Sequence, residues 1–154
     1  MVNLYAPEWN DAEPGPPPFI ARSVRLGARA GAEHLGASLY EIPPGGAVSP
    51  LHIHHANEEL AFVISGRPTL RMLEEERGLV SGEVVAFPTG PRGAHRIENR
   101  TDEPCRVLIV STRVSPEIVE YPDSGKVGAM ALGESPVRVL VRTDQQVGYF
   151  DGEI

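Results

Sequence analysis

Short apolar runs alternate with turn-forming residues along most of the chain, and this pattern predicts an all-β fold. The runs that read as strands occupy residues 19–26, 35–42, 59–65, 69–73, 83–88, 95–99 and 106–112. Clusters rich in glycine and proline separate them, at 43–46, 66–68, 81–82 and 90–93. Closely spaced strands with such turns are typical of a β-sandwich or a β-barrel.

The two ends of the chain follow different patterns. Residues 1–18 end in a proline-rich stretch that fits neither a helix nor a central strand, so we expect an extended N-terminal arm and a single domain over 19–154. Near the C-terminus, residues 137–142 and 147–150 resemble the two strands of a hairpin. No window of eleven or more residues carries a helical stripe, and the best candidate for a short helical turn is 115–119.

One predicted strand, Glu59–Ser65, is apolar on both faces. Successive side chains of a strand point to opposite sides, so Ala61 and Val63 face one way. The opposite face carries what we call the Leu60 row, which consists of Leu60, Phe62 and Ile64. A strand that is apolar on both faces needs cover on both. The N-terminal arm, a second sheet or another subunit could supply it, and we expect a homodimer that buries the Leu60 row.

Composition and charge narrow the class of protein. The chain has 154 residues, the size of one ordinary domain, and a formal charge of −7, which argues against a nucleic-acid partner. The single cysteine, Cys105, excludes an internal disulfide and suits a reducing compartment. The N-terminus lacks the pattern of a signal peptide, and no apolar run approaches the ~20 residues of a membrane span. We therefore expect a cytoplasmic protein without a membrane partner.

Four of the five histidines fall in two short segments, and three of them form a candidate metal site with one glutamate. In a strand, His52 and His54 present their imidazoles to the same side. Glu59 begins the next strand on the side of Ala61 and Val63, and His95 follows a glycine-rich turn. We predict that His52, His54, Glu59 and His95 bind one metal ion.

The donor types indicate which metals suit this site. Three neutral imidazoles and one carboxylate favour a divalent transition metal (iron, manganese, nickel, cobalt or zinc) over magnesium or calcium. Four protein ligands on a six-coordinate ion leave two positions open, where a chelating small molecule, water or dioxygen would bind. We expect no organic cofactor.

Neighbouring residues offer alternatives to these ligands. Glu58 competes with Glu59, but by strand parity it points away with Leu60. His55 follows His54 directly and so points to the opposite side of the strand, and we expect it at the surface or behind the ligands. We expect His34 in a solvated loop.

Two motifs in this region resemble those of the cupin superfamily. The pattern Gly46-x5-His52-x-His54-x4-Glu59-x6-Gly66 fits the first cupin motif at every position. The pattern Gly82-x5-Pro88-x-Gly90-x4-His95-x3-Asn99 is similar to the second, with four residues between Gly90 and His95 where the family usually has two. The motifs occupy 46–66 and 82–99. The resemblance implies a jelly-roll barrel with a metal near its mouth, and the segments 54–59 and 121–126 resemble a group of small bacterial cupins.

Such a site is compatible with several functions. Our first hypothesis is a metal-dependent enzyme that acts on a small oxygen-rich molecule by dioxygenation, decarboxylation or aldose–ketose isomerisation. Isomerisation requires a base near the metal, and Glu58 and His55 point away by parity, which mildly favours the other two reactions. The alternative is a non-catalytic module that binds or senses a small molecule, and a metal-free sugar epimerase ranks last. The catalytic residues are left open.

Overall fold

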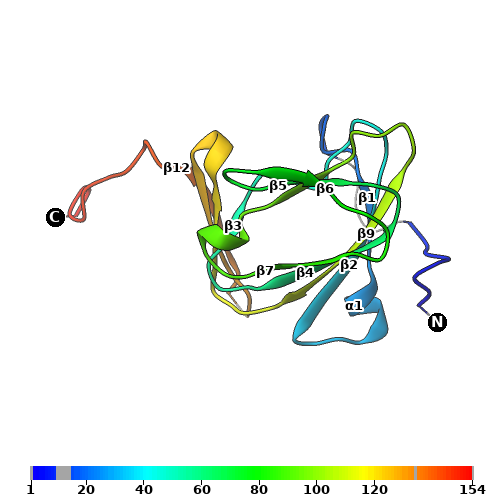
Figure 1. The fold of residues 1–154 in the computed structure, drawn as a ribbon. Helices are drawn as coiled ribbons and strands as arrows, with labels where there is room; N and C mark the ends of the chain where they lie inside the picture. Colours follow the sequence, from blue (N-terminus) through cyan, green and yellow to red (C-terminus); the bar gives the residue numbers. More distant parts are fainter. Residues whose placement is uncertain (1, 10–14, 134, 154) are drawn as a thin grey trace.

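The computed structural model describes residues 2–9, 15–133 and 135–153, and nearly all of their regular structure is β-strand (Figure 1). The elements are β1 (Arg22–Arg25), α1 (Leu26–Ala30), β2 (Leu35–Ile42), β3 (Ile53–His54), β4 (Glu59–Ser65), β5 (Thr69–Arg71), β6 (Glu76–Gly78), β7 (Val84–Phe87), η1 (Pro91–Gly93), β8 (Arg96–Glu98), β9 (Cys105–Thr112), β10 (Glu117–Tyr121), η2 (Pro122–Ser124), β11 (Lys126–Ala131) and β12 (Val137–Arg142). The predicted all-β class is confirmed.

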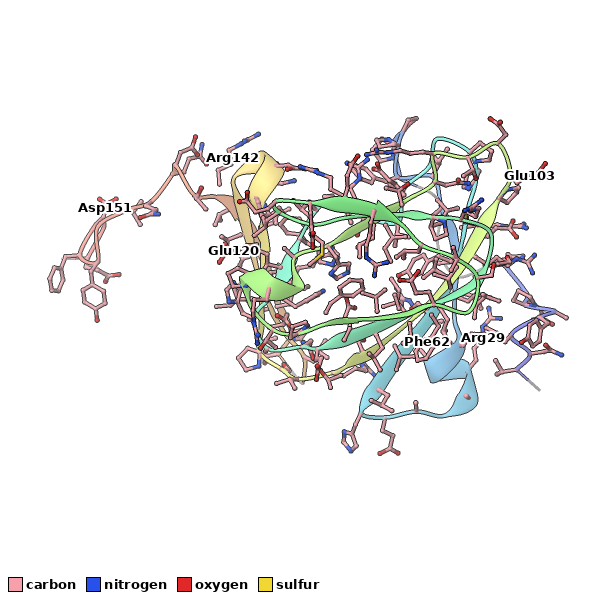
Figure 2. All side chains as sticks on the ribbon, viewed as in Figure 1. Arg29, Phe62, Glu103, Glu120, Arg142 and Asp151 are labelled. Atoms are coloured by element: carbon pink, nitrogen blue, oxygen red, sulfur yellow. The ribbon has the colours of Figure 1, made fainter. Side chains whose placement is uncertain are left out.

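The strands form three antiparallel sheets, with the orders β1-β2-β9-β4-β7, β12-β11-β10-β3 and β6-β5-β8. In Figure 1 the five-stranded sheet lies below the three-stranded one, and the sheet that contains β3 closes one side. Side chains fill the space between them (Figure 2). The buried core residues there are Ile42, Ala61, Val63, Leu70, Leu79, Phe87, Ile97, Val107 and Ile109. Ala61 and Val63 therefore face the core, as the alternation along β4 predicts.

A second, smaller apolar cluster lies on the other face of the five-stranded sheet. Its buried members are Val24, Leu26 and Leu39, and Leu4, Trp9, Ile64 and Leu108 pack against them. The N-terminal segment thus contributes to the cover over Ile64, one end of the Leu60 row. Leu60 at the other end remains 38% exposed and neighbouring Val84 53% exposed.

The helical turn predicted at 115–119 is wrong. Residues Glu117–Tyr121 form β10, which pairs with both β3 and β11. A serine–proline step followed by a glutamate resembles the start of a helix, but pairing with strands on both sides overrides this local preference.

The predicted C-terminal hairpin is also wrong. Its first strand forms as β12, but it pairs with β11 instead of 147–150. Residues 149–152 form a turn instead, with Tyr149 90% exposed. This segment extends away from the sheets and carries Asp151 far from Phe62 (Figures 1 and 2).

The remaining predictions about organisation concern the N-terminal end. The strand expected at 19–26 is shorter, because residues 26–30 form helix α1, which ends at the left-handed Gly31. Of the predicted arm at 1–18, residues 1 and 10–14 lie outside the described residues, and the division into arm and domain stays a prediction. Within the described residues, no helix is long and apolar enough to cross a membrane.

Candidate metal centre

The first two histidines are positioned by backbone pairing. His54 ends β3 and lies opposite Val119 of β10. His52 pairs with His95 in an antiparallel bridge, in which the N–H of each residue donates to the carbonyl of the other at 3.2 and 3.0 Å. The two sequence motifs are therefore joined directly through these histidines.

The longer loop before His95 forms a compact turn. Its two extra residues fit into η1, where Gly93 N donates to Gly90 O at 2.9 Å and Ala94 N to Pro91 O at 3.1 Å. Gly90 N also donates to His54 O at 2.8 Å, which ties the loop to β3. The departure from the usual spacing thus leaves His95 beside the other histidines.

The structure brings all four predicted site residues together. The Oε2 atom of Glu59 lies 3.1 Å from His95 Nε2 and 3.6 Å from His54 Nε2. One ligand atom each from His52, His54 and Glu59 lie within 4.8 Å of one another, so these three residues could hold a metal ion. His95 falls outside this group of three but contacts Glu59. The ring of His95 lies 4.4 Å from that of His52, centroid to centroid. Glu58 is exposed, and His55 contacts Glu120 at 2.7 Å instead.

Hydrogen bonds leave the same nitrogen available on two of the rings. Nδ1 of His52 lies 2.9 Å from Pro50 O, and Nδ1 of His95 lies 2.9 Å from Gly93 O. A carbonyl accepts only from a protonated nitrogen, so Nε2 of each neutral ring keeps its lone pair for a ligand bond. Phe87 stacks on His95 at 3.8 Å between centroids and fixes the plane of its ring.

Nδ1 of His54 is buried without a hydrogen-bond partner among the described residues. A buried polar atom without a partner is unusual in a protein interior. The fit to a transition metal comes instead from the donor set on the side of Glu59, where imidazole nitrogens and one carboxylate, which such ions bind, face one another.

The electrostatics of the cluster keep His52 and Glu59 in the forms that bind metals. Burial, followed by the neighbouring charges of His95 and His54, lowers the pKa of His52 to about 4, so this imidazole is neutral near pH 7. Burial alone would raise the pKa of Glu59, but the close contact of its Oε2 atom with His95 Nε2 and the neighbouring charges of the histidines lower this pKa overall. Glu59 is therefore a carboxylate near neutral pH.

Sequence reasoning missed two residues of the site, Asn57 and Glu117, which are 8% and 6% exposed. With His54 and Glu59 they line a cleft of about 190 Å³, whose other walls come from Ser111, Thr112, Arg113, Val114, Ser115, Met130 and Leu132. Their position depends on β10 pairing with β3, which no local pattern revealed.

The segment 121–126 forms the tight connection between β10 and β11. The ring of Tyr121 lies 6.4 Å from that of His52, and Lys126 Nζ lies 5.4 Å from the Tyr121 ring. Asp123 makes a two-pronged ion pair with Arg71 at 2.6 and 2.9 Å. The segment is therefore fixed to β5 near the site.

Comparisons with known proteins agree with this architecture. Residues 38–111 match the family described as the cupin domain. A sugar phosphate isomerase of the cupin superfamily from Silicibacter pomeroyi is 28% identical, with 98% of both chains covered and a TM-score of 0.81. A proposed sugar phosphate isomerase from Acidithiobacillus ferrooxidans is 30% identical over 86% of this chain and 82% of its own, with a TM-score of 0.77.

A curated relative matches a smaller part of the chain. An uncharacterised protein from Methanocaldococcus jannaschii is 30% identical over 70 residues, which are 46% of this chain and 54% of the relative. The chain thus spans about half the length of this curated relative. The matched family, the jelly-roll arrangement of the strands and the superfamily of the structural relative agree, and the chain belongs to the cupin family as a small cupin-type domain.

Proposed function

We propose that this cupin is a metal-dependent enzyme that isomerises a phosphorylated sugar. The observation that carries the proposal is the meeting of three imidazoles and one carboxylate beside a cleft. His52, His54 and His95 lie around Glu59, and His54 and Glu59 also line the cleft. A substrate in this cleft would lie next to the candidate metal ligands.

The substrate class comes from the two structural relatives above. Both carry the name of a sugar phosphate isomerase, one of them as a proposal, and they are 28% and 30% identical to this chain. The sequence pattern alone mildly favoured oxygen chemistry or decarboxylation. The relatives shift that preference to isomerisation, which was among the reactions left open.

The residues of the site have distinct tasks in this proposal. Nε2 of the three histidines and the carboxylate of Glu59 would hold one divalent transition metal, which supplies Lewis acidity to a sugar carbonyl or hydroxyl when bound. Isomerisation also moves a proton between neighbouring carbons and needs a base. Both carboxylates of the cleft have other tasks, Glu59 as a metal ligand and Glu117 as the acceptor of hydrogen bonds from His55, Ala56 and Asn57, so the base is left open.

Proton exchange offers a direct test of this function. The protein, loaded in turn with Mn²⁺, Fe²⁺, Co²⁺ and Zn²⁺, is incubated in D₂O with a panel of aldose and ketose phosphates and followed by proton NMR. We expect conversion between an aldose and a ketose phosphate, with deuterium entering the carbon next to the carbonyl. His52→Ala should abolish both signals, while His55→Ala, which alters the neighbouring exposed imidazole, should retain them.

Three results would contradict the proposal. Oxygen uptake would indicate oxygenase chemistry, and release of carbon dioxide would indicate decarboxylation. Ligand-dependent melting shifts without turnover on any sugar phosphate would indicate the non-catalytic binding module.

A further inference from the structure

We infer that Glu117 and Asn57 act as positioning residues that hold His54 with its proton on Nδ1, so that Nε2 faces Glu59 and the metal. This inference rests on the metal centre of the proposed function. It assigns a role to two buried polar residues that are not among the defining positions of the motifs: Asn57 lies between His54 and Glu59, and Glu117 lies outside both motifs.

Glu117 ties β10 to the chain that follows His54. It is the first residue of β10, and its side chain is 7% exposed. Its Oε1 atom accepts from the backbone N–H of His55 at 3.0 Å and of Ala56 at 3.2 Å. These two donors fix Oε1 as an acceptor and direct Oε2 toward Asn57 and His54.

The amide of Asn57 can face Glu117 in only one way. Its Oδ1 atom accepts from Val114 N at 2.6 Å and from Thr112 Oγ1 at 3.0 Å. Its Nδ2 atom donates to Val114 O at 3.1 Å and to Glu117 Oε2. Rotating the amide would lose these bonds, so a donor always faces Glu117, and a charged carboxylate is the matching acceptor.

Nδ1 of His54 lies 3.7 Å from Glu117 Oε2. This is longer than a hydrogen bond, and Nδ1 has no other partner among the described residues. His52 and His95 each place Nδ1 against a backbone carbonyl. For His54, the carboxylate of Glu117 takes the place of that carbonyl: a modest tilt of the ring would close the gap and fix the proton on Nδ1.

Glu117→Gln tests this arrangement because it turns the acceptor that faces Asn57 and His54 into a donor and keeps the size of the side chain. The two backbone N–H donors require the amide oxygen at the Oε1 position, so the new NH₂ group faces Asn57 and His54. An NH₂ group donates to Nδ1 and thereby selects the tautomer with its proton on Nε2. That proton blocks the nitrogen that would bind the metal.

The matched control is Glu41→Gln. Glu41 is also a largely buried, hydrogen-bonded carboxylate, but its partners are Arg22 and Arg106 rather than site residues. Any loss of metal binding caused only by a less stable fold should appear in this control as well.

Three measurements test the positioning role. In the metal-free wild-type protein, nitrogen-15 NMR of the histidine rings should show His54 with its proton on Nδ1, and Glu117→Gln should move it to Nε2. In titrations of the metal-free proteins with Co²⁺, Glu117→Gln should bind about 10- to 100-fold more weakly than wild type, and Glu41→Gln should bind as wild type. The visible spectrum of bound Co²⁺ should also change in Glu117→Gln alone.

The outcomes separate this inference from the metal centre itself. Wild-type protein that fails to bind Co²⁺ would overturn the metal centre. Wild-type protein that binds Co²⁺ while Glu117→Gln binds it equally well would overturn the positioning role. A wild-type His54 with its proton on Nε2 would also overturn it, without need of any variant.

Discussion

Nε2 of His95 lies 3.1 Å from Oε2 of Glu59, although the two residues come from different sequence motifs and precede or begin different strands. The contact exists because the bridge between His52 and His95 fixes the backbone of His95, while β4 directs Glu59 toward the same interior. Substitutions that displace the His52–His95 bridge or β4 should therefore weaken metal binding.

Gly93→Ala should disturb the loop that supports His95. A Cβ atom at Gly93 would overlap the carbonyl oxygen of Pro88, so η1 must shift, and Gly93 O is the partner of His95 Nδ1. We expect a loss of at least about 1 and up to about 3 kcal/mol in the free energy of unfolding, measured by urea denaturation, together with weaker binding of Co²⁺.

Gly78→Ala is the control for this prediction. Gly78 has open space around a new Cβ atom and no left-handed backbone. Its stability and metal binding should stay close to those of wild type. Equal behaviour of the two variants would show that the tight packing at Gly93 does not support the site.

Stability should depend on pH through Glu41. Burial would raise the pKa of Glu41, but hydrogen bonds from Arg106 and Arg22 lower it below the ordinary 4.5. A carboxyl with a lowered folded-state pKa stabilises the fold above its unfolded pKa, and this contribution is lost as the pH falls through the folded value. Glu41→Gln should therefore be less stable than wild type near pH 7, and the difference should shrink below about pH 4.

Urea denaturation of both proteins across this pH range provides the measurement. A difference that stays constant between about pH 7 and pH 3 would mean that the charge of Glu41 contributes nothing to stability.

The open end of the Leu60 row is the basis for a prediction about assembly. Leu60 and Val84 are 38% and 53% exposed on neighbouring strands, while Ile64 at the far end is covered. We propose that a second copy of the chain covers this open end. Light scattering should give twice the mass of the 16.6 kDa chain, and Leu60→Lys should give the monomer mass.

The control is Glu58→Gln, which should leave the dimer intact. Glu58 is exposed and lies near Leu60 in the chain but outside the Leu60 row. A wild-type protein that scatters as a monomer at micromolar concentration would refute the dimer.

The parts of the fold that follow strand alternation were predictable from the sequence. The bounds predicted for Leu35–Ile42 and Glu59–Ser65 match β2 and β4, because apolar and turn residues mark their ends. Parity along β4 also placed Glu59, and not Glu58, toward the imidazoles. These features depend on local spacing, which a sequence shows directly.

The features that the sequence concealed depend on pairing between distant segments. β11 (Lys126–Ala131) has a single β-branched residue, Val127, and is otherwise poor in the residues typical of strands, so it was not recognised as the partner of β12. Without β11 the strand character of β10 was also missed, and with it the inward position of Glu117. No spacing rule links Glu117 to Asn57, which meet only in the folded chain.

The central claim is that this cupin holds one transition metal, and metal analysis tests it most directly. After reconstitution with iron, manganese or zinc and removal of excess metal, mass spectrometry of the intact protein should find close to one ion per chain. His52→Ala should lose the ion. His55→Ala should keep it, because the imidazole of His55 contacts Glu120 instead of the other site residues. Less than about a tenth of an equivalent in the wild-type protein with all of these metals would contradict the claim, since a site of these donors binds such ions tightly.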